Sequence, residues 1–230
     1  SEFNITKYLQ PGKNSIVAEV FKYSTGAFFE LQDMPHMVGI IRDVMLIARP
    51  NVYIRDYHIM ADISEDLKSA NVKLDVDVRN LSKADAKDYF VDAYILGADG
   101  KFVSGDSIFS KKIQEIKTSG EISISGKKSV DGFKLWSPDK PNLYALLIKL
   151  SDSNGNVLET IRADFAFRKF EIRGKEIFLN NKPLLIKGVN HHDWSPDKGK
   201  AYSCDWMIKD MRLMKQANVN FVRTSHYPKD

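Results

Sequence analysis

The hydrophobic and polar positions of the chain form three successive patterns. In residues 1–50 two apolar runs, "NSIVAEVFKY" and "GIIRDVMLIARP", flank an irregular segment, "STGAFFELQDMPHMV". A Pro-Gly pair in "LQPGKN" marks a turn before the first run. This pattern predicts the closing strands of a β-structure with a long loop between them.

Residues 51–168 alternate more regularly. In "NVKLDVDVRN" apolar and charged residues alternate, which is the period of a half-buried strand. Turn signals at Asp99-Gly100 and Asn154-Gly155 predict two hairpins. Strands about ten residues apart with turns between them are typical of an immunoglobulin-like β-sandwich. This stretch contains no cysteine, so the sandwich lacks the disulfide of antibody domains.

Residues 169–230 change to a mixed period. "KPLLIKGVN" has the pattern of a buried parallel strand, and "VNFVRTSHYP" predicts the next one. Between them, Ser203 is a plausible N-cap of a helix whose Met207, Met211 and Met214 form an inward stripe, and Asn218 is a plausible stop. Strand, helix and strand make one βαβ unit. A single unit cannot cover both faces of its strands, so it needs more of a barrel or sheet.

Composition narrows the class of protein. The 230 residues are 43% hydrophobic and 28% charged, which indicates one or two globular domains. The net charge of +4, without a basic run, argues against a nucleic-acid partner. We find no apolar run long enough to span a bilayer and no signal-type N-terminus, so we expect no membrane partner. Cys204 is the only cysteine, which excludes an internal disulfide and leaves the compartment open. Both ends interrupt a pattern, so we expect a piece of a longer chain.

Three histidines follow the two predicted parallel strands. His191 and His192 come after the first strand, and His226 comes after the second, 34 residues beyond His192. Reactive side chains collect at the carboxyl ends of such strands. The imidazoles of His192 and His226 would therefore lie at the same end of the two strands. Two other interpretations stay open at this point. The histidines could bond backbone carbonyls in loops, or two of them could bind a metal with a distant third ligand, since the run His191, His192, Asp193 cannot place all three side chains on one ion.

Other candidates have simpler explanations. Ser225 and His226 are neighbours on an extended segment, so their side chains point apart and do not form a nucleophile–base pair. Cys204 at the helix start is either an activated thiol or a small residue near the N-cap. Asp33 is either a turn residue or a ligand for a hydroxyl or a cation.

Four segments resemble successive signature segments of family 2 glycoside hydrolases. In chain order they are "FELQDMPHMVGIIRDVMLIARP", "LWSPDKPNLYALLIKL", "FLNNKPLLIKGVNHHDWSP" and "NVNFVRTSHYP". The nearest branch is the bacterial lactose-cleaving β-galactosidases. Their first segment has the form Q-D-M…M-x-G-I-x-R-D-V, whereas in the related β-glucuronidases and β-mannosidases it ends more like G-I-Y-R-P-V.

The resemblance implies a mainly β fold in three parts. Residues 1–50 would be the end of a jelly-roll sugar-binding domain, residues 51–168 an immunoglobulin-like β-sandwich, and residues 169–230 the first β/α/β of a catalytic TIM barrel. In the family, the histidines that match His192 and His226 stabilise the transition state through sugar hydroxyls.

The resemblance assigns further roles. Arg223 matches an arginine that braces the nucleophilic carboxylate, and Asp33 matches an aspartate that binds galactose and Na⁺. His191 stands in place of the usual arginine and inherits no role.

The resemblance also implies what this chain lacks. A retaining glycosidase needs two carboxylates about 5 Å apart, and in the family both are glutamates on later barrel strands. The Mg²⁺ ligands also lie outside this chain. We therefore predict a fragment of a retaining β-galactosidase that hydrolyses terminal β-D-galactosides such as lactose. The fragment would be inactive alone, and its parent would be a homo-oligomer. The alternatives are a family 2 enzyme of other specificity (β-glucuronidase or β-mannosidase) and a stand-alone carbohydrate-binding module.

Overall fold

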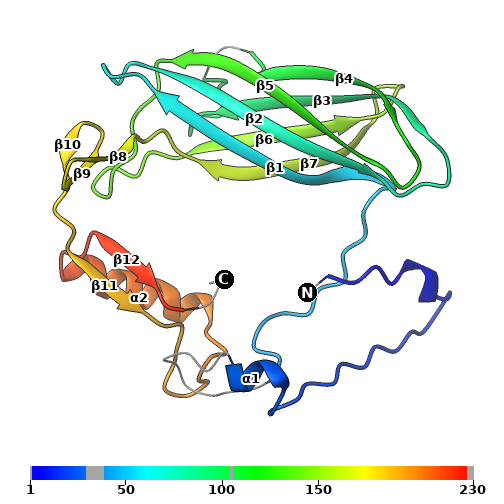
Figure 1. The fold of residues 1–230 in the computed structure, drawn as a ribbon, viewed down its shortest axis with the longest axis horizontal. Coiled ribbons are helices and arrows are strands. Elements are labelled where there is room, and N and C mark those ends of the chain that lie inside the picture. The colour runs from blue at the N-terminus through cyan, green and yellow to red at the C-terminus, as the bar shows by residue number, and fades with distance from the viewer. Residues whose placement is uncertain (1, 30–38, 104–105, 227–230) are drawn as a thin grey trace. The chain divides into compact units, whose positions relative to one another are not determined.

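The computed structural model describes residues 2–29, 39–103 and 106–226. The chain is mainly β, as predicted. It divides into two compact units. One comprises Leu46–Leu185, and the other comprises Ser1–Met45 together with Ile186–Asp230. Figure 1 labels the elements of both units, which are described separately below.

The larger unit contains the predicted β-sandwich (Figure 1). One sheet has the order β1-β2-β5, and the other has the order β4-β3-β6-β7, with every pairing antiparallel. β4 therefore pairs with β3 in the four-stranded sheet, whereas β5 belongs to the three-stranded sheet. The strands are β1 (Val52–Ile63), β2 (Ser69–Asn80), β3 (Ala86–Leu96), β4 (Phe109–Ile116), β5 (Glu121–Asp131), β6 (Tyr144–Ser151) and β7 (Val157–Phe165).

Alternating side chains of both sheets form the core. On β2 the inward positions from Val72 to Val78 are at most 1% exposed, and on β6 Leu146, Ile148 and Leu150 are equally buried. The alternation in "NVKLDVDVRN" is therefore confirmed. The packing of the core also requires a glycine at position 126 on β5. A Cβ built there would lie only 2.6 Å from Cβ of Phe109 on β4 and would overlap the ring. Only glycine leaves room for this ring.

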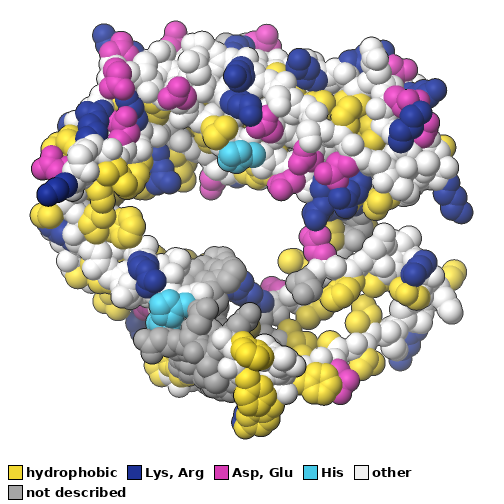
Figure 2. Space-filling model, in the orientation of Figure 1, with side chains coloured by type: hydrophobic (Ala, Val, Ile, Leu, Met, Phe, Trp, Pro, Cys, Tyr) yellow, Lys and Arg dark blue, Asp and Glu magenta, His cyan; other side chains and the backbone are white. Residues whose placement is uncertain are grey.

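The outward face of the sandwich is polar. The residues of β2 between the core positions pair with β5 across the sheet surface, for example Arg79 Nε with Glu121 Oε2 at 2.6 Å. Ser125 and Ser123 donate hydrogen bonds to Asp75 and Asp77 in the same way. On the face in Figure 2, positive and negative side chains are interspersed over the sandwich.

Both predicted hairpin turns are present. In the first, Gly97 N–H donates to Lys101 O at 2.8 Å, and Gly100 takes a φ of 75° that glycine adopts without strain. In the second, the Asp152 carboxylate accepts the N–H groups of Asn154 and Asn156, both at 2.9 Å. These local hydrogen bonds explain why the turn residues were readable from the sequence.

A buried amide joins three segments of the sandwich. Asn80, at the end of β2, is fully buried. Its Nδ2 donates to the carbonyl oxygens of Ala84 at 2.9 Å, Ile116 at 3.1 Å and Lys117 at 3.3 Å. Its Oδ1 accepts from the backbone N–H and the hydroxyl of Ser82. The end of β2, the following turn and the end of β4 therefore meet at one side chain.

A small antiparallel sheet follows the sandwich and belongs to the same unit. It has the order β10-β9-β8 and consists of β8 (Phe170–Arg173), β9 (Glu176–Leu179) and β10 (Lys182–Pro183). Asn180 and Asn181 both have positive φ, 52° and 61°, which is the signature of a type I′ hairpin turn.

The β1–β2 loop holds this small sheet. The carbonyl oxygen of Glu65 accepts from Asn181 Nδ2 at 2.7 Å, and its carboxylate pairs with Lys169. Lys169 is largely buried and also lies 3.4 Å from Glu171. On the other side, Asn180 Nδ2 donates to Trp136 O at 2.9 Å. The hairpin is therefore anchored to the sandwich by hydrogen bonds and ion pairs.

The described residues of 2–50 differ from the prediction of closing strands. They contain the short helices η1 (Thr6–Tyr8) and α1 (Thr25–Phe29), and none of them is assigned to a strand. The apolar side chains of both runs are exposed, including Val17 and Val44. A strand forms only where another backbone accepts its hydrogen bonds, and the described part of this segment offers no such partner.

The second unit contains the predicted βαβ element. β11 (Gly188–His191) and β12 (Phe221–Thr224) pair in parallel, and α2 (Cys204–Gln216) connects them. Ser203 lies at the predicted N-cap position, although its side chain makes no capping hydrogen bond, and Asn218 ends the helix as predicted. Asn218 has a φ of 58° and donates to Lys215 O, while Val219 N–H donates to Met214 O, which is a Schellman motif.

The apolar run before β11 is exposed, contrary to the prediction of a buried parallel strand. Lys182–Pro183 belongs to the antiparallel sheet, and only Gly188–His191 forms the parallel strand. Leu185 is 75% exposed and Ile186 38%. The described residues pair β11 with one strand, β12, so the two-stranded sheet has too few neighbours to cover this run.

Candidate functional site

Asn220 aligns the two parallel strands. Its side-chain oxygen accepts Lys187 N–H at 2.8 Å, and its own N–H donates to Lys187 O at 3.1 Å. The register that follows places His191 opposite Thr224, so both strands end at the same level. Beyond the strand ends, Ser225 N–H donates to His191 O at 3.1 Å and continues the pairing by one residue.

His192 and His226 lie side by side at these strand ends. Their ring centroids are 5.3 Å apart and their planes are inclined at 78°. The two imidazoles come from adjacent strands, and the side chain of His226 is exposed. The expectation that they lie at the same end of the two strands is therefore met by the geometry. The exposed ring of His226 can present its nitrogens to a bound hydroxyl, whereas Nδ1 of His192 is buried.

Arg223 lies on β12, three residues before His226. Its register partner is Asn190, and its Nη1 donates to Ser225 Oγ at 3.1 Å. The distance from Nη1 to Asn190 Oδ1 is 3.5 Å. Arg223 is exposed and Ser225 is buried, so the guanidinium is fixed at one edge and accessible elsewhere. A guanidinium held in this way can orient a carboxylate.

His191 has partners that the sequence did not reveal. Its Nε2 lies 3.0 Å from Asp210 Oδ2 on α2, and its Nδ1 lies 3.6 Å from Asp193 Oδ1. The hydroxyl of Tyr202 donates to the same Asp210 oxygen. The His191 side chain is only 11% exposed. His191, to which the family resemblance assigns no role, therefore joins β11 to α2.

Burial and hydrogen bonding shift two pKa values in this cluster. Burial raises the pKa of the Tyr202 phenol above its ordinary value, and the neighbouring Asp210 raises it further. Burial alone would also raise the pKa of Asp210. The hydrogen bonds from Tyr202 and His191 outweigh it and hold the pKa of this carboxyl below its ordinary value. Asp210 is therefore an ionised acceptor and Tyr202 a neutral donor at neutral pH.

A signal for this cluster existed in the helix sequence. Met207 and Met214 are half-buried, but Met211 is 44% exposed, so the inward stripe is not the predicted Met207–Met211–Met214. Asp210 takes the inward position, three residues after Met207 and four before Met214. A carboxylate in the middle of an apolar stripe indicates a buried partner, which here is His191.

The remaining candidates from the sequence are a metal site, Cys204 and Asp33. Among the described residues no group of three or more His, Cys, Asp or Glu side chains could hold a metal, because the rings of His191 and His192 go to different partners. Cys204 is exposed at the first position of α2. Asp33 lies outside the described residues. Neither α1 nor α2, in the part of the chain that the structure describes, is long and apolar enough to cross a membrane.

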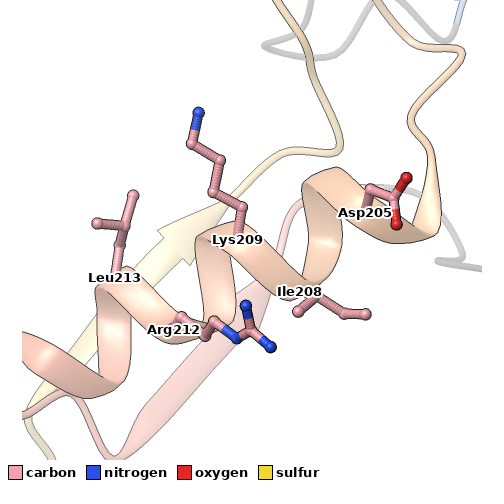
Figure 3. Close-up of a pocket in the computed structure, with 5 residues that line it drawn as sticks. All are labelled: Asp205, Ile208, Lys209, Arg212 and Leu213. Carbon is pink, nitrogen blue, oxygen red and sulfur yellow. The ribbon is translucent and has the colours of Figure 1, made fainter.

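Figure 3 shows a surface depression on α2. The residues that line it all come from this one helix: Asp205, Ile208, Lys209, Arg212 and Leu213. The residues of α2 that reach the strand ends, Asp210 above all, are not among them. The depression is therefore distinct from the histidine pair.

Three family models match the chain. Residues 1–50 match "Glycosyl hydrolases family 2, sugar binding domain", residues 52–168 match "Glycosyl hydrolases family 2", and residues 170–230 match "Glycosyl hydrolases family 2, TIM barrel domain". Together they cover the chain almost from end to end.

Curated relatives and solved structures are similar over most of the chain. A β-galactosidase of Priestia megaterium is 33% identical over 100% of this chain, and one of Pectobacterium atrosepticum is 37% identical over 99%. The chain spans 22% of the length of each. The crystal structure of a Bacteroides uniformis β-glucuronidase has a TM-score of 0.78 at 28% identity, over 87% of this chain and 24% of that one. A β-galacturonidase of Eisenbergiella tayi bound to galacturonate has a TM-score of 0.68 at 29% identity, over 79% of this chain and 30% of that one.

Proposed function

Because the chain belongs to family 2 of the glycosyl hydrolases, we propose that it is part of a retaining β-galactosidase that hydrolyses terminal β-D-galactosides such as lactose. The names of the curated relatives support the galactoside, since those above are β-galactosidases. In this proposal the chain contributes the end of a sugar-binding jelly roll (1–50), the sandwich (51–168) and the first β/α/β of the catalytic barrel (169–230).

The adjacent imidazoles of His192 and His226 are the observation that carries this proposal. Hydrolysis of a glycoside passes through an oxocarbenium-like transition state, which is stabilised by hydrogen bonds to ring hydroxyls that strengthen as charge develops. An imidazole can donate such a bond without a permanent charge at neutral pH. Two imidazoles at the ends of adjacent strands can reach neighbouring hydroxyls of one sugar ring.

Arg223 and Asp33 complete the proposed substrate side. The guanidinium of Arg223, fixed by Ser225 Oγ, would brace the nucleophilic carboxylate of the whole enzyme. Asp33 would bind a galactose hydroxyl and a Na⁺ ion, as the resemblance implies. The Mg²⁺ of the whole enzyme would be held by residues outside this chain.

The chain alone should not hydrolyse glycosides. A retaining mechanism requires an acid/base carboxylate and a nucleophilic carboxylate about 5 Å apart. The resemblance places both on glutamates of later barrel strands, and histidines cannot replace a nucleophile that forms a glycosyl-enzyme. Turnover of nitrophenyl β-galactoside by the purified chain, in excess of a host-strain control, would refute this part of the proposal.

A second candidate is a family 2 enzyme of different sugar specificity. The solved structures favour it, because a β-glucuronidase and a β-galacturonidase are similar to this chain in fold. A uronic acid carries a carboxylate where galactose carries a hydroxymethyl group, so the enzyme must supply a cation for it. A third candidate, a carbohydrate-binding module, leaves the βαβ unit without a purpose.

One set of assays separates these candidates. The full-length protein that contains this chain is tested on nitrophenyl β-galactoside, β-glucuronide, β-galacturonide and β-mannoside, and the anomer first released is identified by NMR. We expect the galactoside to have the highest kcat/KM and the product to retain its configuration. Preference for a uronide would replace the galactosidase by the second candidate. Galactose binding by the 230-residue chain alone, without turnover by the full-length protein, would favour the module. Light scattering of the full-length protein tests the expected homo-oligomer.

A further inference from the structure

The carboxylate of Asp210 joins β11, α2 and the segment before α2. Its Oδ2 is 3.0 Å from His191 Nε2 and accepts the hydroxyl of Tyr202. We propose that His191, Asp210 and Tyr202 are positioning residues for the imidazoles of His192 and His226. The three residues fix the end of β11 against α2, and the site depends on this attachment. The inference rests on the proposed function, because it needs a reaction in which these imidazoles take part.

The hydrogen-bond chemistry fixes one donor of His191. An ionised carboxylate can only accept, so the nitrogen that faces Asp210, Nε2, carries a proton. The opposite nitrogen, Nδ1, then faces Asp193 Oδ1 at 3.6 Å. The charged and titratable groups around the ring are Asp193 from the strand end, Tyr202 from the loop and Asp210 from α2, with Lys209 acting on Asp210. An imidazole held by two carboxylates and an aromatic ring has little freedom to turn.

The backbone transmits this attachment to both imidazoles. His192 follows His191 directly, so the anchored ring fixes the peptide from which His192 projects. The carbonyl oxygen of His191 accepts Ser225 N–H at 3.1 Å, and His226 follows Ser225 directly. Each imidazole of the pair is therefore one residue away from a restrained peptide. Displacement of a catalytic group by about 1 Å can lower a rate by roughly 10²-fold, so this restraint should be visible in kcat.

The first experiment removes the shared acceptor in the full-length protein. Asp210→Ala should lower kcat roughly ten-fold, with KM within about three-fold of wild type, because the groups that bind the ground state are untouched. Rates are expressed per active site titrated with a covalent inactivator, so that loss of folded protein does not count. Asp205→Ala is the matched control, since it removes an exposed carboxylate from the same helix and should leave kcat within two-fold.

Four further variants of the cluster separate the loss of its hydrogen bonds from a loss of folding. Tyr202→Phe keeps the ring and removes only the hydroxyl, and it should lower kcat about three-fold. His191→Gln keeps an N–H donor near the Nε2 position, so it should retain more activity than His191→Leu. The double variant His191→Leu/Asp210→Ala should lose no more activity than the less active single variant, because each change removes the same interaction between His191 and Asp210.

Ligand binding gives a readout that a purely structural role would not produce. In Asp210→Ala the affinity for galactonolactone, a planar transition-state mimic, should fall in proportion to kcat, while the affinity for an unreactive thiogalactoside stays within two-fold. Wild-type kcat per titrated site in Asp210→Ala and His191→Leu would overturn the inference. Equal loss of affinity for both ligands would do the same.

His192→Phe distinguishes this inference from the proposed function. If His192→Phe lowers kcat by orders of magnitude and Asp210→Ala does not lower it, the function stands and the positioning role is overturned. If His192→Phe and His226→Phe both have wild-type kcat, the catalytic role of the imidazoles and the positioning role are both overturned, because no catalytic imidazole remains to be positioned. A large effect of His192→Phe with a ten-fold effect of Asp210→Ala supports both.

Discussion

The rings of His192 and His226 pack edge to face, with their centroids 5.3 Å apart. Since the two residues are 34 positions apart in the sequence, the parallel pairing of β11 and β12 alone brings them together. Their packing means that a phenylalanine can replace either ring and keep the edge-to-face contact. Such a replacement removes the ring nitrogens with little change in shape.

Replacement of either imidazole in the full-length protein tests its role. We expect His192→Phe and His226→Phe each to lower kcat by two to three orders of magnitude, or about 3–4 kcal/mol, with a smaller change in KM. The reason is that a donor used mainly in the transition state contributes little to ground-state binding. His58→Phe, on an exposed position of β1, is the control and should be silent. A His226→Phe variant with altered stability and unaltered kcat would indicate a structural histidine.

The proposed role of Asp33 is tested by measuring how sodium activates hydrolysis. If its carboxylate binds both a sugar hydroxyl and Na⁺, Asp33→Asn should raise KM and weaken activation by sodium, since it loses charge-assisted contacts. The measurement is a sodium titration of nitrophenyl galactoside hydrolysis by the full-length protein, with ionic strength kept constant by a potassium salt. Asp43→Asn is a control in the same part of the sequence. Wild-type kinetics of Asp33→Asn across the titration would identify Asp33 as a turn residue.

Gly126 is tested by chemical denaturation of the chain. We expect Gly126→Ala to lower the free energy of unfolding by roughly 1–3 kcal/mol, because the new methyl group overlaps the Phe109 ring. Ser129→Ala, at an exposed position of the same strand, should change it by less than about 0.5 kcal/mol. Adding Phe109→Leu should relieve part of the overlap, so that the double variant loses less than the sum of the singles. A strictly additive double variant would contradict the contact.

The pH dependence of stability reports on Asp210 and Tyr202. The pKa of Asp210 is lowered in the folded state, so its contribution is complete above its ordinary value of 3.8 and is lost as the pH falls below it. The pKa of Tyr202 is raised, so its contribution is complete below its ordinary value of 10.0 and is lost as the pH rises above it. Asp210→Asn should flatten the acidic limb of melting temperature against pH, and Tyr202→Phe the alkaline limb. Unchanged limbs would show that the cluster does not titrate as described.

The sandwich was predictable because its signals are local. Alternation along β2 and the Asp-Gly and Asn-Gly turns are properties of neighbouring residues, and the structure reproduces them. The strands predicted in residues 1–50 failed for the opposite reason. Pairing is a property of two distant segments, and an apolar run without a partner stays extended and exposed, as at Val17 and Val44.

The histidine site was predictable in part. Strand ends and spacing indicated His192 and His226, because parallel strands align their carboxyl ends. His191 was missed because the family resemblance offered no role for a histidine in place of an arginine. The sequence did contain its partner, since Asp210 interrupts the apolar stripe of α2 on the side of Met207 and Met214. Only the fold shows that this aspartate and His191, 19 residues apart, meet.

The buried amide of Asn80 has a consequence for the order of folding. Its Nδ2 reaches the oxygens of Ile116 and Lys117, and these two hydrogen bonds can form only after β4 has docked. Interactions made after the rate-limiting step resist unfolding without speeding folding. In stopped-flow experiments on Asn80→Ala, we expect the unfolding rate constant to rise strongly and the folding rate constant to stay nearly unchanged. Asn80 would then determine how long the native sandwich lasts, and the apolar alternation how quickly it forms.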